Sequence, residues 1–147
     1  MSHTIKYIAI LVFLFPQIAY SEAVKTPKPL TLLSVPQLAA VCAALLNTFS
    51  DAAAAQPNPS SIDSQMTRLL MFREVWMDSS PTVLPVREMT ELMNRALLQP
   101  KEDFLEQFSF CAESGAQILS TMTESKKFAL LSRAVSFRDE TIAKRKK

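Results

Sequence analysis

The chain contains two cysteines, Cys42 and Cys111, and one histidine, His3. Paired thiols can form a disulfide, carry out redox chemistry or hold a metal ion. Redox enzymes usually place their cysteines as Cys-x-x-Cys near the start of a helix, whereas these two lie about 70 residues apart. We therefore expect a structural disulfide between Cys42 and Cys111, with two buried free thiols as the alternative. We expect neither a metal site nor a cofactor.

The N-terminus has the pattern of a secretory signal peptide over residues 1–21. Lys6 precedes a short apolar run at 7–15. The small residues Ala19 and Ser21 suit the −3 and −1 positions of a cleavage site, and Ser21 and Ala23 offer a second choice. The run is shorter than the roughly 20 residues of a membrane span, although an uncleaved signal anchor is an alternative. We expect a periplasmic or secreted protein with no stable membrane insertion after cleavage. Disulfides persist in such oxidising compartments.

Cleavage would also remove His3, and this excludes several kinds of active site. A mature chain without imidazole has no Ser-His-Asp triad, no Cys-His pair and no His-ligated metal. The single glycine argues against Gly-rich phosphate loops and nucleophile elbows. A formal net charge of +2 does not favour nucleic-acid binding, and the four bases at 144–147 are typical of a solvated helix end.

The remaining chain follows the 3.6-residue period of amphipathic helices. After an extended lead-in at 22–33, we expect a single helical domain at 34–143 and a basic tail at 144–147. The fold class is all-α, a small antiparallel bundle of four to five amphipathic helices. The first predicted helix is capped by Ser34 and ends near residue 55. The second and third cover residues 62–78 and 85–98. The fourth starts at Pro100, and the fifth is capped by Thr123 or Ser125. The last two could instead form one long bent helix.

The helical period also predicts which side chains face the core. Cys42 and Cys111 lie on the inner stripes of the first and fourth helices, and Gly115 should permit the close approach of a neighbouring helix. In the last helix we expect Phe128, Leu131, Val135 and Ile142 to face inward. Leu130 and Phe137 lie off that stripe, so they are either buried on a second side or form an apolar patch for a partner.

The fourth helix carries an acidic side opposite its apolar stripe. Glu102, Glu106 and Glu113 fall on this side, and Phe110 lies toward it. An acidic face is usually solvated, but an exposed phenylalanine beside one is typical of a partner-binding hot spot. Arg73 lies within the apolar face of the second helix. It either covers that face with its stem, pairs with an acid across the bundle or protrudes as a binding residue.

The segment Glu113-Ser114-Gly115 resembles the stretch around the catalytic acid of lytic transglycosylases, which are helical periplasmic enzymes. The resemblance would imply that Glu113 is a catalytic acid. It covers only these few residues, and the Gly-rich continuation that shapes the cleft of that family is missing. We therefore interpret Glu113 as a surface residue. An enzyme that uses carboxylates alone would need two acids facing one another in a cleft.

Together these patterns favour an exported, disulfide-stabilised and non-catalytic helical protein that binds another protein. Periplasmic immunity proteins and adaptors are of similar size, helical and contain cysteines. The analogy rests on these features alone. The predicted partner-binding residues are Phe110, Glu102, Glu106, Glu113, Leu130 and Phe137. The alternatives are a periplasmic carrier of an apolar ligand, with a closed cavity between helices, or a small periplasmic chaperone.

Overall fold

The computed structural model describes residues 25–56, 63–80 and 83–147. The predicted signal peptide at 1–21 lies outside these ranges. All regular structure in the described ranges is helical, which confirms the all-α fold. The helices are α2 (Lys28–Thr31), α3 (Val35–Ala54), α4 (Asp63–Ser79), α5 (Val86–Leu98), α6 (Lys101–Ser120) and α7 (Glu124–Arg145). No helix of these ranges is long and apolar enough to cross a membrane.

Side-chain caps set the start of two helices. The Ser34 hydroxyl accepts a hydrogen bond from the backbone N–H of Gln37, and the Ser34 N–H donates to Gln37 Oε1 at 3.0 Å, which completes the predicted capping box. Thr123 caps α7 by accepting from the N–H of Lys126. Because this cap starts a new helix after the end of α6, the alternative of one long bent helix is wrong.

The lead-in differs from its expected extended form. Residues 28–31 make the single turn α2, and Leu30 packs into the main core. The prolines do not prevent this turn, because Pro27 precedes it and Pro29 lies in its first turn, where the missing N–H is tolerated. Burial of Leu30 favours the turn over an extended chain that would leave this side chain in water.

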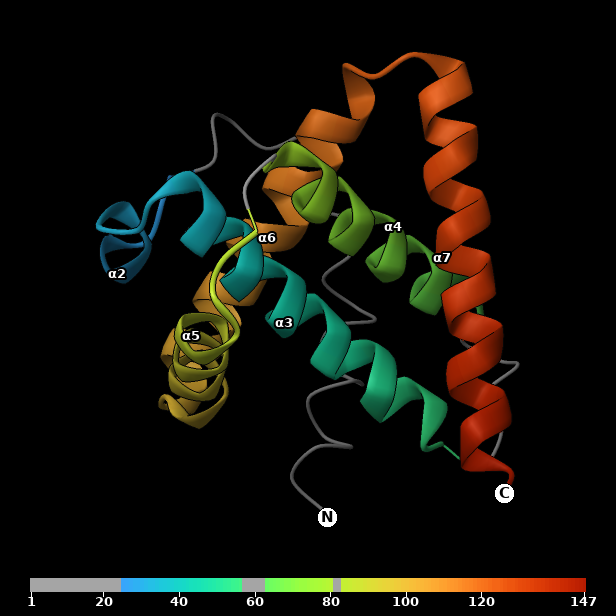
Figure 1. Ribbon diagram of the computed structural model, residues 1–147, viewed down its shortest axis with the longest axis horizontal. Helices are drawn as coiled ribbons and strands as arrows, with labels where there is room; N and C mark the ends of the chain where they lie inside the picture. The colour runs from blue at the N-terminus through green and yellow to red at the C-terminus, as the bar shows by residue number, and fades with distance from the viewer. Residues whose placement is uncertain (1–24, 57–62, 81–82) are drawn as a thin grey trace.

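The helices are not all antiparallel to one another (Figure 1). α3 and α4 run side by side in opposite directions, and α6 and α7 also run in opposite directions on either side of the turn at 121–123. α5 is seen almost end-on in the same view, so it crosses the other helices steeply. α7 packs mainly on α4, at one edge of the molecule.

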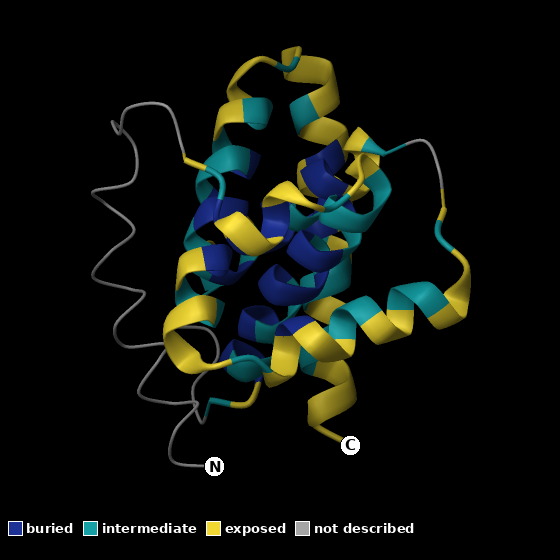
Figure 2. Cartoon of the chain, turned by 90° about the vertical axis from the view of Figure 1, so that its left-hand side faces the viewer, coloured by how far each residue is buried: buried dark blue, intermediate teal, exposed yellow. Residues whose placement is uncertain are grey.

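The predicted disulfide is present at the centre of the main core. Cys42 and Cys111 are fully buried and bonded, with their Cα atoms 5.2 Å apart, so that α3 is tied to α6. The indole N–H of Trp76 donates to the Cys111 carbonyl oxygen at 2.8 Å and links α4 to the same point. Figure 2 shows the buried residues gathered where these helices meet. The disulfide and the indole hydrogen bond therefore connect α3, α4 and α6 at one cystine.

Gly115 has the role expected from the sequence. A Cβ atom at this position would lie 3.0 Å from Cβ of Phe72, a separation tighter than nearly all real side-chain contacts. The absence of a side chain therefore lets α6 lie directly against α4.

The inward face of α7 matches the prediction at Ile142, which packs against the second core cluster, but differs from it elsewhere. Leu130 and Ala134 are fully buried, and Phe137 packs with Ala134 against Met66 and Leu70 of α4. Phe128, expected inside, is 69% exposed, and Leu131 is 36% exposed. α7 carries two apolar stripes at helical spacing, and the stripe that meets α4 is the one that includes Leu130. The prediction that Phe128 and Leu131 face the core is therefore wrong.

Candidate binding groove

The described residues form an apolar groove of about 340 Å³ between α3 and α5, beside the end of α4. One face of α3 makes its floor, which consists almost entirely of small side chains: Pro36, Ala39, Ala40, Ala43, Ala44 and Asn47. Methionines and branched side chains of α4, α5 and the segment between them make its walls: Met77, Val83, Leu84, Met89 and Met93. These residues define what we call the groove. It is open to the surface and is not a closed cavity.

The groove continues onto apolar surface at one rim. Met77 is half exposed, Val83 is 87% exposed, and Val86, the first residue of α5, is also exposed. At the Pro36 end, a hydrogen bond of 2.8 Å from Gln37 Nε2 to Glu88 Oε1 joins α3 to α5. A floor of small side chains and an exposed apolar rim together leave room for an apolar segment from outside the described structure.

Arg73 brings a charged group to the groove. Its side chain is only 16% exposed, and Nη1 lies 3.0 Å from Oε1 of Glu74, its neighbour in sequence. The guanidinium also stacks on the ring of Phe137, 4.3 Å from the ring centroid. Of the three sequence-based interpretations of Arg73, pairing with an acid describes the structure best, but the acid belongs to α4 itself.

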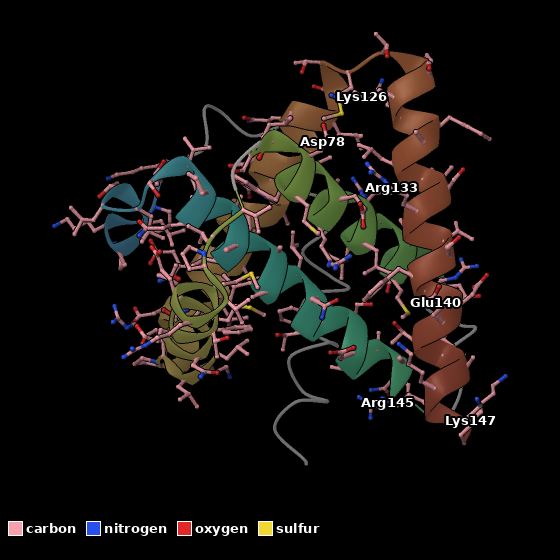
Figure 3. The ribbon with its side chains drawn as sticks, viewed as in Figure 1. Asp78, Lys126, Arg133, Glu140, Arg145 and Lys147 are labelled. Carbon is pink, nitrogen blue, oxygen red and sulfur yellow. A yellow bond between two sulfur atoms is a disulfide. The ribbon has the colours of Figure 1, made fainter. Side chains whose placement is uncertain are left out.

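A set of ion pairs joins α4 to α7, and Lys126 and Arg133 of α7 lie across from Asp78 of α4 (Figure 3). Glu74 Oε2 lies 3.3 Å from Nε of Arg133, and Asp78 lies 2.9 Å from Nζ of Lys126. Arg133 also approaches Asp78, at 3.9 Å. We call these five residues, Arg73 included, the charge clasp. Within the clasp, the salt bridge to Glu74 holds the guanidinium of Arg73 in place.

Two other hollows are smaller or more polar. A pocket of about 260 Å³ lies beside Phe49 and Phe104, between α3 and the start of α6. A shallow depression on α7 contains Arg133, Ser136 and Glu140, and its floor includes Phe137. Neither combines an apolar floor, apolar walls and a fixed internal charge as the groove does.

The predicted hot spot on α6 lacks the exposed aromatic side chain expected at its centre. Phe110 is only 8% exposed and lies against Trp76, with ring centroids 6.3 Å apart. The reason is that α6 is covered on two sides, by α3 and by α4, so its apolar face is wider than a single stripe. Glu102 and Glu106 are exposed as expected, and Glu113 is half-buried.

The predicted patch on α7 is also not a surface. Leu130 is fully buried, and Phe137 is half-buried beneath the guanidinium of Arg73. The structure therefore resolves the choice left open by the sequence for these two residues, in favour of burial. None of the six predicted partner-binding residues lines the groove.

Sequence reasoning did not find the groove, although a signal for it was present. Alanines recur at positions 39, 40, 43 and 44, the spacing of one helix face, on a side of α3 away from Cys42. A helix face of small residues leaves a hollow wherever its neighbours cannot close on it. The four-residue spacing of Met89 and Met93 on α5 completes the pattern.

The part of the chain that the structure describes brings no three His, Cys, Asp or Glu side chains close enough to hold a metal ion. Comparison of the chain with protein-family models, with curated proteins and with solved structures gives no match. The function proposed below therefore rests on the geometry of the groove and on the sequence.

Proposed function

We propose that this protein is an exported, non-catalytic interaction module of the immunity or adaptor type. Its binding site is the groove, which takes the apolar face of a helix from another protein. The observation that carries this proposal is the pairing of a floor of small side chains with walls of methionine. The protein-binding role expected from the sequence is retained, and the site moves from α6 and α7 to α3 and α5.

The chemistry of the groove suits a helical occupant. Alanines on the floor allow a second helix backbone to come close, and methionines adapt their shape to irregular side chains. Helix-in-groove recognition uses apolar anchors at helical spacing. Each large apolar side chain that becomes fully buried contributes roughly 1.5–3 kcal/mol, before the cost of ordering the two chains.

Export is part of the same proposal. A leader with the pattern of a signal peptide and a cystine at the centre of the core both suit an oxidising compartment. The partner would then be met in the periplasm or outside the cell.

Site-specific photo-crosslinking in the producing cells tests the proposed function. A benzophenone amino acid replaces Met93, which lines the groove, or Asn94, which is exposed and lies outside it. We expect Met93 to give a discrete protein adduct whose crosslinked peptide comes from a helix, and Asn94 to give none. The substitution Ala43→Trp, which fills the floor, should abolish the adduct. Equal adducts from both positions, or an adduct that survives Ala43→Trp, would contradict the proposal.

A carrier of an apolar ligand is the second candidate. The volume of the groove suits this role, but the groove is open and is not the closed cavity expected of a carrier. Ligand pockets usually measure roughly 300–1,000 Å³, and the groove has about 340 Å³. Native mass spectrometry of the protein purified from its producer distinguishes the two candidates. A co-purified apolar small molecule that Ala43→Trp removes would support the carrier, and a ligand-free protein would support the interaction module.

A further inference from the structure

We propose that the partner helix carries an acidic side chain that meets Arg73 at the α4 end of the groove. The inference rests on the proposed function, because it concerns the partner that the groove would bind. It goes further by stating the chemistry of that partner: apolar anchors together with one carboxylate placed beside them.

Arg73 is the one charged residue among the side chains that line the groove in the described part of the chain. Its side chain is mostly withdrawn from water, and the ring of Phe137 supports the guanidinium from one side. A cation in such surroundings interacts more strongly with another charge than it would in bulk water. The groove therefore favours a negatively charged group at one end and apolar side chains elsewhere.

The charge clasp compensates this cation only in part. Glu74 is shared by two guanidiniums, since Oε1 meets Arg73 and Oε2 meets Arg133. Asp78 is already paired with Lys126. The clasp thus holds three bases, Arg73, Lys126 and Arg133, against two acids, Glu74 and Asp78, which leaves one positive charge in excess. Figure 3 shows Lys126 and Arg133 of α7 lying across from Asp78 of α4.

An excess positive charge beside an apolar groove selects among helices. A guanidinium presents several N–H donors in one plane, and a carboxylate accepts two of them at once. A helix with Glu or Asp at the matching position would gain this charge-assisted contact. A helix with Lys there would be repelled by Arg73. Arg73 would therefore also lower the affinity of the groove for basic helices.

Selection from a displayed library of helical peptides tests the inference with synthetic partners. Every peptide has one apolar stripe of Leu, Met and Phe, and the positions beside the stripe vary among Glu, Gln, Lys and Ala. The disulfide-bonded protein serves as bait. We expect enriched peptides to carry Glu at one position beside the stripe, and Glu→Gln there to weaken binding by about tenfold or more.

Two bait variants separate the role of Arg73 in the groove from its role in the clasp. Arg73→Met removes the cation that faces the groove, whereas Arg133→Met removes a cation from the same carboxylate, Glu74, without touching the groove lining. We expect Arg73→Met to bind the Glu and Gln forms of an enriched peptide equally. Arg133→Met should keep the preference for Glu. Circular dichroism of each variant establishes that it is folded.

Each result decides between defined alternatives. Enriched helices that Ala43→Trp abolishes, but that show no preference for Glu, would overturn this inference and leave the proposed function standing. Enrichment of no helix, or of peptides that bind the Ala43→Trp bait equally well, would count against the proposed function itself. A preference for Glu that persists in Arg73→Met would overturn the inference by showing that a different group reads the carboxylate.

Discussion

Gly115 is a single residue on which the distance between two helices depends. It lies on α6 opposite Phe72 of α4, and a Cβ there would approach the Phe72 side chain to 3.0 Å and its Cα to 3.5 Å. Glycine in a helix interior costs up to about 1 kcal/mol relative to alanine. The close packing of α6 on α4 offsets this cost.

We expect Gly115→Val to lower the free energy of unfolding by about 1–3 kcal/mol, because the added methyl groups must push against Phe72. Urea denaturation followed by circular dichroism measures the change. Gln117→Val, at an exposed position two residues along α6, is the matched control and should cost no more than a few tenths of a kcal/mol. A loss at Gly115 no larger than the loss at Gln117 would show that contact with Phe72 does not govern this site.

Arg73 illustrates what a single residue reveals before the structure is known. An arginine on an apolar helix face is visibly out of place in the sequence, and this correctly marks Arg73 as a position of interest. Its environment depends on Phe137 and Arg133, which come from a helix some sixty residues further along the chain. No pattern near Arg73 contains that information.

At the scale of the element, α7 shows how two apolar stripes compete for one core. The stripe with Leu130, Ala134 and Phe137 faces α4, and the stripe with Phe128 and Leu131 faces outward. The ion pairs of Lys126 and Arg133 with Asp78 and Glu74 are consistent with the same rotation of the helix.

The rotation of α7 leads to a direct prediction. Leu130→Ala should lower the free energy of unfolding by about 2–5 kcal/mol, since it leaves a cavity at a fully buried site. Phe128→Ser should change it by no more than about 0.5 kcal/mol, because Phe128 is mostly in water. Chemical denaturation of the two variants compares them directly. The reverse order would mean that the stripe expected from the sequence is the one that packs.

The helices themselves could be predicted from the sequence because their signals are local. The capping box of Ser34 and Gln37, the cap at Thr123 and the proline before α6 all lie within a few residues of the boundaries that they set. The faces of α6 and α7 could not be predicted in full, because they depend on how many neighbours cover each helix. Phe110 is buried for this reason, and the groove exists because α5 does not close on the alanines of α3.

At the scale of the whole molecule, the cystine is the strongest constraint. It joins residues 69 positions apart in sequence, and both sulfurs are buried at the meeting point of α3, α4 and α6. A closed loop of this length restricts the unfolded chain far more than the folded one.

We expect the Cys42→Ala, Cys111→Ala double variant to lose about 4 kcal/mol of stability, the value that the chain-entropy model gives for such a loop. Urea unfolding under non-reducing conditions compares it with the parent protein. Because both cysteines are fully buried, the parent disulfide should also resist reduction until the protein is partly unfolded. Rapid reduction in native buffer would contradict the buried, structural role of the bond.

The proposed export leads to a prediction for the intact protein. Mass spectrometry of protein isolated from its producer should give the mass of a chain that begins at Glu22, or at Val24 if the second cleavage site is used, with two hydrogen atoms fewer than the reduced form. The measurement tests the leader and the disulfide together. A mass that includes residues 1–21 would contradict cleavage, and a mass two hydrogen atoms higher would contradict oxidation.

The position of the cystine also determines how the chain would respond to mechanical tension. α4 and α5 lie inside the covalent loop from Cys42 to Cys111, whereas α7 lies outside it. If the two ends were pulled apart, α7 could unravel and lengthen the tether, but the loop would withhold its 69-residue span, about 230 Å of extended chain. The α3 floor beyond Cys42 and the α5 wall of the groove both belong to this shielded stretch, so a load applied at the termini would bypass most of the groove.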